Sequence, residues 1–212
     1  MQITINLQIF LFIILFLLTK QIELYALIMF FALIHECGHI FAGLILKLKP
    51  KKLDIMPFGL AVTFESYGYK KLIEAKKILI ALAGPLTNIS ICAITLLINM
   101  DQNLKQTIIY SNILVALFNL IPIYPLDGGR ILKSCIRIKY KNGIIADIIV
   151  NKISNTLAVL LTAISSILIL YFKNVSILLV IIYLWIIVIR ENKRYNIKKK
   201  VNNIILEQNG KT

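Results

Sequence analysis

Long runs of apolar residues constrain this chain more than any other feature of its sequence. Hydrophobic residues make up 58% of the 212 residues, against about 45–50% in an ordinary soluble domain, and the excess is concentrated in runs. Runs of roughly 17–25 apolar residues are typical of helices that cross a bilayer. The sequence therefore predicts an all-α polytopic membrane protein. We expect one membrane domain over residues 1–189, followed by a basic cytoplasmic tail over residues 190–212.

The apolar runs predict six transmembrane helices. A fourth run, starting near residue 107, loses helical character at two prolines, Pro122 and Pro125. The other five predicted spans cover residues 3–19, 22–46, 78–100, 156–172 and 175–189.

Lysine and arginine lie mainly in alternate loops. Eight lie in the 47–77 loop, six in the 124–155 stretch and seven after Ile189, against only Lys20, Lys105 and Lys173 in the other loops. Because basic loops are retained in the cytoplasm, we expect both termini to be cytoplasmic, and this alternation favours an even number of spans. The net charge of +14 is then explained by membrane orientation, and we expect no nucleic-acid partner.

Two of the predicted cytoplasmic segments are more than simple loops. Residues 53–67 are partly apolar, contain Pro57 and Gly59 and are too short to cross a bilayer, so we expect a short re-entrant or interfacial hairpin. Residues 131–153 alternate apolar and basic side chains, which is typical of a segment lying at the membrane surface. That segment either anchors the chain or contacts a substrate or partner. The three cysteines, Cys37, Cys92 and Cys135, show no paired or metal-type spacing, and we expect them to be reduced.

The second predicted span contains the pentapeptide His35-Glu36-Cys37-Gly38-His39. Residues four apart lie on one face of a helix, so both imidazoles can bind the same zinc ion. Glu36 can reach a water on that ion without being a ligand, as in the His-Glu-x-x-His motif of zinc metalloproteases. These are the only histidines in the chain, and ionisable groups inside a membrane mark function by default. The motif predicts a catalytic zinc site.

Zinc in a catalytic site takes three protein ligands and leaves one position open. Asp127 is the acidic residue that best supplies the third ligand, because it ends the fourth span where prolines and glycines break the helix. Irregular backbone at membrane depth is tolerated only inside protein or beside a wet cavity. We therefore expect one zinc per chain, bound by His35, His39 and Asp127, with Glu36 as the catalytic base.

Two further polar positions lie in the predicted spans. Gly84 and Asn88 share a helix face in Ala83-Gly-Pro-Leu-Thr-Asn88. They either serve helix packing and a kink, or support the helices of the active site. Asn119 lies two turns before Asp127, and its amide either holds the substrate or its oxyanion, or makes a structural hydrogen bond.

Together these motifs resemble the site-2 protease family of intramembrane zinc proteases. The resemblance rests on His35-Glu-Cys-Gly-His39, Ala83-Gly-Pro-Leu-Thr-Asn88 and Asn119-Leu-Ile-Pro-Ile-Tyr-Pro-Leu-Asp127-Gly, and covers roughly residues 1–190. It implies that residues 1–189 form an intramembrane metalloprotease domain. Within the family, the chain looks most like the sporulation stage IV FB type, because of Met56-Pro-Phe-Gly59 and Tyr124-Pro-Leu-Asp-Gly-Gly129.

That subgroup implies cleavage of a membrane-associated pro-sigma factor during sporulation, with inhibitory membrane proteins as partners, in the bacterial cell membrane around the forespore. It also implies ATP sensing by a C-terminal nucleotide-binding domain; only a short basic stretch follows Ile189 here, so we expect no direct response to ATP. One alternative is a site-2-type protease that cuts a membrane-anchored anti-sigma factor or a signal-peptide remnant. Two others are a membrane metal transporter, which would have no need of Glu36, and an inactive scaffold, which would have lost a ligand or the glutamate. The oligomeric state stays open.

Overall fold

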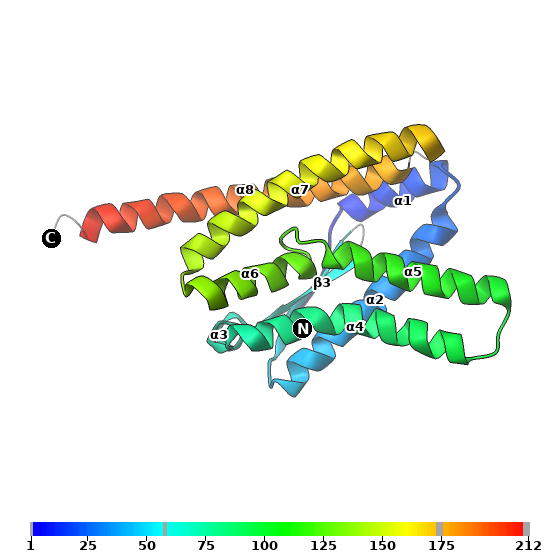
Figure 1. Cartoon of the computed structure of the whole chain (residues 1–212), viewed down its shortest axis with the longest axis horizontal. Helices are drawn as coiled ribbons and strands as arrows, with labels where there is room; N and C mark the ends of the chain where they lie inside the picture. The colour runs from blue at the N-terminus through cyan, green and yellow to red at the C-terminus, as the bar shows by residue number, and fades with distance from the viewer. Residues whose placement is uncertain (1, 57–58, 173–175, 210–212) are drawn as a thin grey trace.

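The structure is a computed structural model that describes residues 2–56, 59–172 and 176–209. It contains eight helices and three short strands in the described residues (Figure 1). In chain order the elements are β1 (Gln2–Ile5), α1 (Gln8–Leu18), α2 (Ile22–Ile45), β2 (Pro50–Met56), β3 (Gly59–Phe64), α3 (Ser66–Lys71), α4 (Glu74–Leu97), α5 (Gln102–Leu120), α6 (Asp127–Tyr140), α7 (Gly143–Phe172) and α8 (Ser176–Asn209).

The three strands form one small sheet in the order β1-β2-β3. The predicted hairpin over residues 53–67 is built from β2 and β3, which pair antiparallel, and its tip at residues 57–58 lies outside the described residues. The first predicted span is wrong at its start, because Ile3 and Ile5 belong to β1, which pairs parallel with β2. Its sequence, Gln-Ile-Thr-Ile, alternates polar and β-branched residues as a strand does. The fold is therefore not purely helical.

Three of the predicted spans are confirmed by length and hydropathy in the described residues: α2, α4 and α7 up to Tyr171. Helix α1 is apolar but only 11 residues long, which is about 16 Å at 1.5 Å per residue, too short for a hydrocarbon core of about 30 Å. Helix α5 carries several polar residues and does not reach the same hydropathy. The sixth predicted span begins at Val175, outside the described residues. A count of six spans is not established.

Many apolar side chains in the three spans are exposed, among them Leu33, Leu86 and Leu170. In an apolar stretch of 18 residues within each helix, only 28% of the residues are buried in α2, 33% in α4 and 17% in α7. Several polar side chains, in contrast, are fully buried between helices, among them His35, His39, Asn88, Asn112 and Asp127. Because lipid tails are as apolar as leucine, helices in a membrane associate through close packing and hydrogen bonds. This distribution places the polar chemistry of the chain at the centre of the helix assembly.

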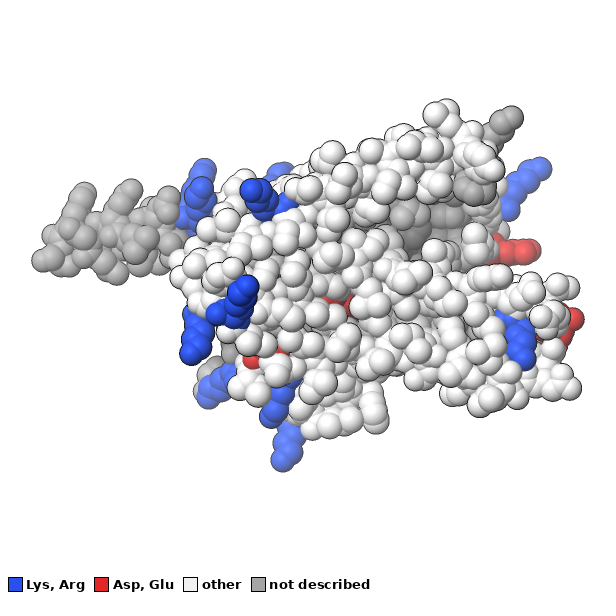
Figure 2. Space-filling view, viewed as in Figure 1, with Lys and Arg blue, Asp and Glu red and all other residues white. Residues whose placement is uncertain are grey.

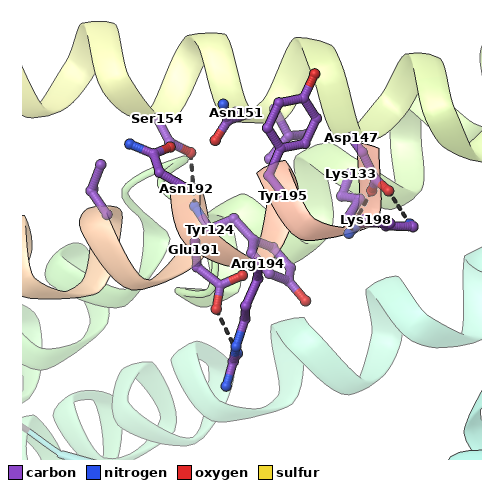
Figure 3. Close-up of a pocket in the computed structure, with 12 residues that line it drawn as sticks. Tyr124, Lys133, Asp147, Asn151, Ser154, Glu191, Asn192, Arg194, Tyr195 and Lys198 are labelled. Atoms are coloured by element: carbon purple, nitrogen blue, oxygen red, sulfur yellow. Dashed lines mark hydrogen bonds and ion pairs between the residues drawn. The ribbon is translucent and has the colours of Figure 1, made fainter. Parts of the chain in front are cut away.

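The predicted surface segment, residues 131–153, spans α6 and the first turns of α7. Its charges are partly engaged within the protein: Lys133 Nζ lies 2.7 Å from an oxygen of Asp147, and Lys198 of α8 pairs with the same carboxylate. Figure 3 shows these pairs beside a cavity of about 190 Å³ between α6, α7 and α8. None of the predicted site residues lines this cavity. The ion pairs of Asp147 beside it join α7 to α6 and to α8.

The last two helices are longer than the spans predicted in them. Helix α7 continues from Gly143 through the fifth predicted span, and α8 runs across the predicted domain boundary at residues 189 and 190. In Figure 1, α8 extends well beyond the other helices. On the face shown in Figure 2, lysine and arginine gather mainly at the end of the molecule where α3 and α6 lie.

Candidate metal centre

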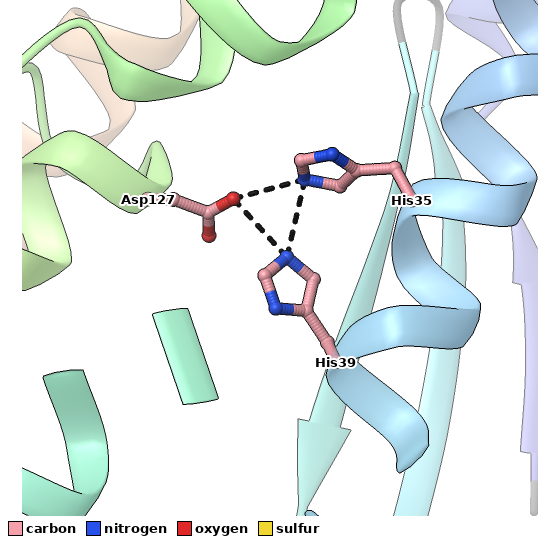
Figure 4. Close-up of side chains that lie close together, drawn as sticks. All are labelled: His35, His39 and Asp127. Carbon is pink, nitrogen blue, oxygen red and sulfur yellow. Dashed lines mark hydrogen bonds and ion pairs between the residues drawn. The ribbon is translucent and has the colours of Figure 1, made fainter. Parts of the chain in front are cut away.

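Three potential metal ligands converge at the centre of the helix assembly (Figure 4). Helix α2 presents the Nε2 atoms of His35 and His39, which lie 3.2 Å apart. Oδ2 of Asp127 lies 3.0 Å from His35 Nε2 and 3.1 Å from His39 Nε2. All three residues are buried, with exposed fractions of 2%, 2% and 4%. They are the only group of metal-type ligands found among the described residues.

The triangle of ligand atoms fits a zinc ion. Zinc binds histidine nitrogen and carboxylate oxygen at about 2.0–2.2 Å in tetrahedral geometry, which separates neighbouring ligand atoms by about 3.3 Å. The three separations of 3.0–3.2 Å are close to that value. Two histidines and one carboxylate also leave the fourth position of the tetrahedron free for a water or a substrate.

The other ring nitrogen of each histidine has a partner that accepts a hydrogen bond. Nδ1 of His39 donates to the backbone carbonyl of Ile80 in α4 at 2.7 Å. Nδ1 of His35 donates to Oδ1 of Asn88, also in α4, at 2.5 Å. With both Nδ1 atoms protonated, the Nε2 lone pairs and the carboxylate oxygen point at one another, which is unfavourable unless a cation lies between them. The hydrogen bonds thus orient the rings as metal ligands commonly are.

Gly84 of α4 lies directly against the two imidazoles. A Cβ atom at this position would be only 2.4 Å from Nε2 of both His35 and His39. The same helix meets α2 at Gly38, where an added Cβ would lie 2.2 Å from the hydroxyl of Thr87. Residues without a side chain therefore let α4 approach α2 closely enough to support both ligands.

Asp127 is the first residue of α6. The prediction that it ends the preceding span is therefore wrong. After α5 ends at Leu120, a short hooked loop over residues 121–126 leads into α6 at Asp127 (Figure 1). A Cβ on Gly128 would lie 2.1 Å from the carbonyl oxygen of Leu120, and one on Gly129 would lie 2.4 Å from the backbone nitrogen of Tyr124. The two glycines thus allow the turn to fold back on α6 and bring the carboxylate to the histidines.

Glu36 lies beside the ligand group without belonging to it. With Asn119 and Asp127 it lines a cavity of about 120 Å³ that reaches the ligands. Its Oε2 accepts a hydrogen bond of 3.2 Å from the backbone N–H of Val62, in β3. The sheet therefore contacts the carboxylate that the sequence predicts to be the base.

The structure leaves both interpretations of Asn119 open. Its Nδ2 donates to the carbonyl of Val115 in its own helix at 3.0 Å, which is a structural hydrogen bond. Its side chain nevertheless lines the cavity beside Glu36, within the region where a substrate would lie.

Asp54, which could have competed as a third ligand, is engaged elsewhere. Its Oδ1 lies 2.5 Å from Nζ of Lys52 and accepts a hydrogen bond from Thr4. Partial burial alone would raise the pKa of Asp54, but these hydrogen bonds outweigh it and hold the pKa below its usual value. Its charge is thus used within the sheet.

Sequence reasoning missed three residues that contact the site directly or through another side chain. Arg130 follows the two glycines, and its Nη1 lies 3.7 Å from Oδ1 of Asp127. It lines both the cavity beside Glu36 and a neighbouring cavity of about 380 Å³ beside His39. Val62 contributes only a backbone N–H, and Asn112 reaches the site only through Asn88. Of these, only Arg130 left a signal in the sequence, because it is a charged residue one turn after a predicted ligand.

The chain shares sequence and fold with known proteases. Residues 98–164 match Peptidase family M50; this region includes Asn119 and Asp127. Stage IV sporulation protein FB of Bacillus subtilis is 32% identical over 120 residues, which is 55% of this chain and 41% of that protein. A zinc metalloprotease of Methanocaldococcus jannaschii is 29% identical over 124 residues, 55% of this chain and 35% of that protein. The matched region thus spans less than half the length of either relative.

The fold is similar to that of a solved structure, the site-2 protease from Methanocaldococcus jannaschii. The TM-score is 0.70 at 24% sequence identity, and the match covers 90% of this chain and 91% of the other. Family match, relatives and fold agree with the motifs, and they confirm the chain's resemblance to the site-2 proteases of peptidase family M50.

Proposed function

We propose that this chain is an intramembrane zinc metalloprotease that hydrolyses peptide bonds of a membrane-associated protein. The observation that carries the proposal is the triangle of His35, His39 and Asp127 with Glu36 on the wall of the adjoining cavity. A bound zinc would polarise the scissile carbonyl and increase the acidity of the attacking water. The similarity to the zinc metalloprotease of Methanocaldococcus jannaschii supports the same chemistry.

In this proposal, Glu36 takes the proton of the attacking water and later delivers it to the leaving amine. Its position beside the ligands but outside their group leaves its carboxylate free for that role. Asn119 and Arg130 line the same cavity, and their N–H groups are available to a substrate carbonyl as charge develops on its oxygen.

A substrate helix must unwind before its peptide bonds become accessible. Strand β3 pairs with β2 on one side only, and its Val62, Thr63 and Phe64 line the cavity beside His39. An extended peptide can add to such an edge through main-chain hydrogen bonds. We infer that the β2–β3 hairpin holds the unwound segment next to the metal centre.

The finer proposal is that the substrate is a pro-sigma factor processed during sporulation, with inhibitory membrane proteins as partners. It is supported by the similarity to stage IV sporulation protein FB. The enzyme would then lie in the cell membrane around the forespore, with both termini in the cytoplasm.

The substitution Glu36→Gln tests the proposal. Full-length chain is reconstituted in lipid with a candidate pro-sigma factor, and product on a gel and zinc per chain are measured together. Glu36→Gln should lower cleavage about 10²–10⁴-fold, as expected for a positioned proton-transfer group, while zinc content stays at one per chain. Glu23→Gln, the same change at an exposed position of the same helix, is the control and should retain activity. Cleavage by zinc-loaded Glu36→Gln at the control rate would refute the assignment of Glu36 as base.

A further inference from the structure

Two buried amides connect His35 to the backbone of α5. Asn88 and Asn112 are both 0% exposed. Nδ2 of Asn88 donates to Oδ1 of Asn112 at 2.8 Å, and Nδ2 of Asn112 donates to the carbonyl of Ile108 at 2.9 Å. With the hydrogen bond from His35 Nδ1 to Asn88 Oδ1, these contacts form an unbroken chain from a metal ligand to a main-chain group.

The last member of this chain fixes the direction of every hydrogen bond in it. The carbonyl of Ile108 can only accept, so Asn112 turns its Nδ2 toward Ile108 and its Oδ1 toward Asn88. Asn88 must then turn its Nδ2 toward Asn112, which leaves its Oδ1 facing His35. Because an amide oxygen only accepts, the proton of a neutral His35 must be on Nδ1. Its Nε2 then carries the lone pair that a metal requires.

Without Asn112, no hydrogen bond among the described residues would fix the orientation of the Asn88 amide. Rotated by half a turn, the amide would offer Nδ2 to His35 in place of Oδ1. That orientation suits the other tautomer of His35, whose Nε2 carries a proton and cannot bind a metal. The residue at position 112, in α5, thus determines whether Nε2 of His35, in α2, is available to a metal.

We propose that Asn112 is a positioning residue of the metal centre, which acts through Asn88 to fix His35 with its proton on Nδ1. The inference rests on the proposed function only in that the ligand group binds zinc. The competing explanation is that Asn88 and Asn112 merely join α4 to α5, since amides often link helices in membranes.

The chain contains a matched control for that explanation. Asn155 of α7 and Asn192 of α8 exchange two amide hydrogen bonds, of 3.1 and 2.8 Å. They also join two helices, but their hydrogen bonds within the described part of the chain do not lead to the metal ligands. Asn112→Leu and Asn155→Leu each remove an amide pair and keep a branched side chain of similar shape.

The first test is the affinity of the solubilised full-length chain for zinc, measured by competition with a chelator. Asn112→Leu should weaken zinc binding about tenfold, the lower end of the range for residues that orient metal ligands, whereas Asn155→Leu should leave it unchanged. In an Asn88→Ala background, Asn112→Leu should have no further effect, because the two residues act in series. If Asn112→Leu does not fold, Asn112→Ser replaces it; its hydroxyl can bond back within α5 but is too short to reach Asn88.

The second test uses the fact that the chain has only two histidines. Histidine labelled with ¹⁵N gives one Nδ1–H signal from each residue of the zinc-loaded protein. Asn112→Leu should shift or broaden the signal of His35 and leave that of His39, which donates to a backbone carbonyl, unchanged. Equal changes at both histidines, unchanged zinc affinity, or additive losses with Asn88→Ala would overturn the proposal. Neither test measures proteolysis, so a failure of the proposed protease function would leave both results interpretable.

Discussion

At the scale of single residues, the site depends on space smaller than a methyl group. Gly84 leaves room for both imidazoles, because an added Cβ would meet each Nε2 at 2.4 Å. Contacts this short cannot be relieved without moving the rings or the helix that carries Gly84. The geometry of the ligands is therefore set partly by a residue that has no side chain.

Gly84→Ala should consequently lower zinc affinity by at least about tenfold, comparable to the loss of a residue that orients a ligand. Chelator competition on the purified chain measures this effect. Gly143→Ala is the matched control, since its Cβ would meet nothing nearer than 3.8 Å, and it should bind zinc as the unmodified chain does. Normal zinc affinity in Gly84→Ala would show that α4 adjusts without cost to the site.

Some residues of the site can be predicted from the sequence and others cannot, for physical reasons. His35 and His39 stand out because ionisable groups are rare in apolar helices, and Asp127 because prolines and glycines surround it. Asn112 has no such signal, because its importance lies in the direction of a hydrogen bond relayed from another helix. The role of Asn119 stays undecided for a similar reason: its amide contacts its own helix and lines the cavity as well.

At the scale of elements, β3 provides the contact between the sheet and Glu36. The backbone N–H of Val62 donates to Glu36, so it points away from the pairing with β2. Proline is tolerated on an edge strand where its missing N–H faces outward. Val62→Pro can therefore remove this donor and leave the sheet intact.

Val62→Pro should reduce cleavage at least about tenfold with zinc content unchanged, since a hydrogen bond to a charged group contributes about 1.5–3 kcal/mol. Val62→Ala loses more of the buried side chain but keeps the N–H, and should retain most activity. The assay is product formation by both variants in lipid, with zinc measured in parallel. Equal losses in both variants would attribute the effect to packing of Val62 alone.

The strands are also where sequence reasoning was least accurate. The 53–67 segment was predicted as a hairpin, but Ile3–Ile5 was assigned to a helix because the apolar run continues without interruption into α1. Only the pairing of β1 with β2, some fifty residues later in the chain, distinguishes the two structures. The start of α7 at Gly143, well before the predicted fifth span, was likewise missed, because ion pairs such as Lys133 with Asp147 are formed between separate helices.

At the scale of the whole molecule, the distribution of charge predicts the orientation in the membrane. Reporter fusions at Asn103, in the first turn of α5, and at the C-terminus should report opposite sides of the membrane, with the C-terminus cytoplasmic. Alkaline phosphatase and a cytoplasmic fluorescent reporter at each position measure this directly. The same side for both fusions would contradict the predicted topology, because it would require an even number of crossings between those points.

The exposure of many apolar side chains has a consequence for how such a chain changes over evolutionary time. If exposed apolar positions such as Leu97 and Leu170, 88% and 81% exposed, contact lipid, they need only to be apolar, and exchanges among leucine, isoleucine, valine and phenylalanine there are nearly neutral. Such positions can drift with the base composition of a genome while the buried polar residues stay fixed by their hydrogen bonds.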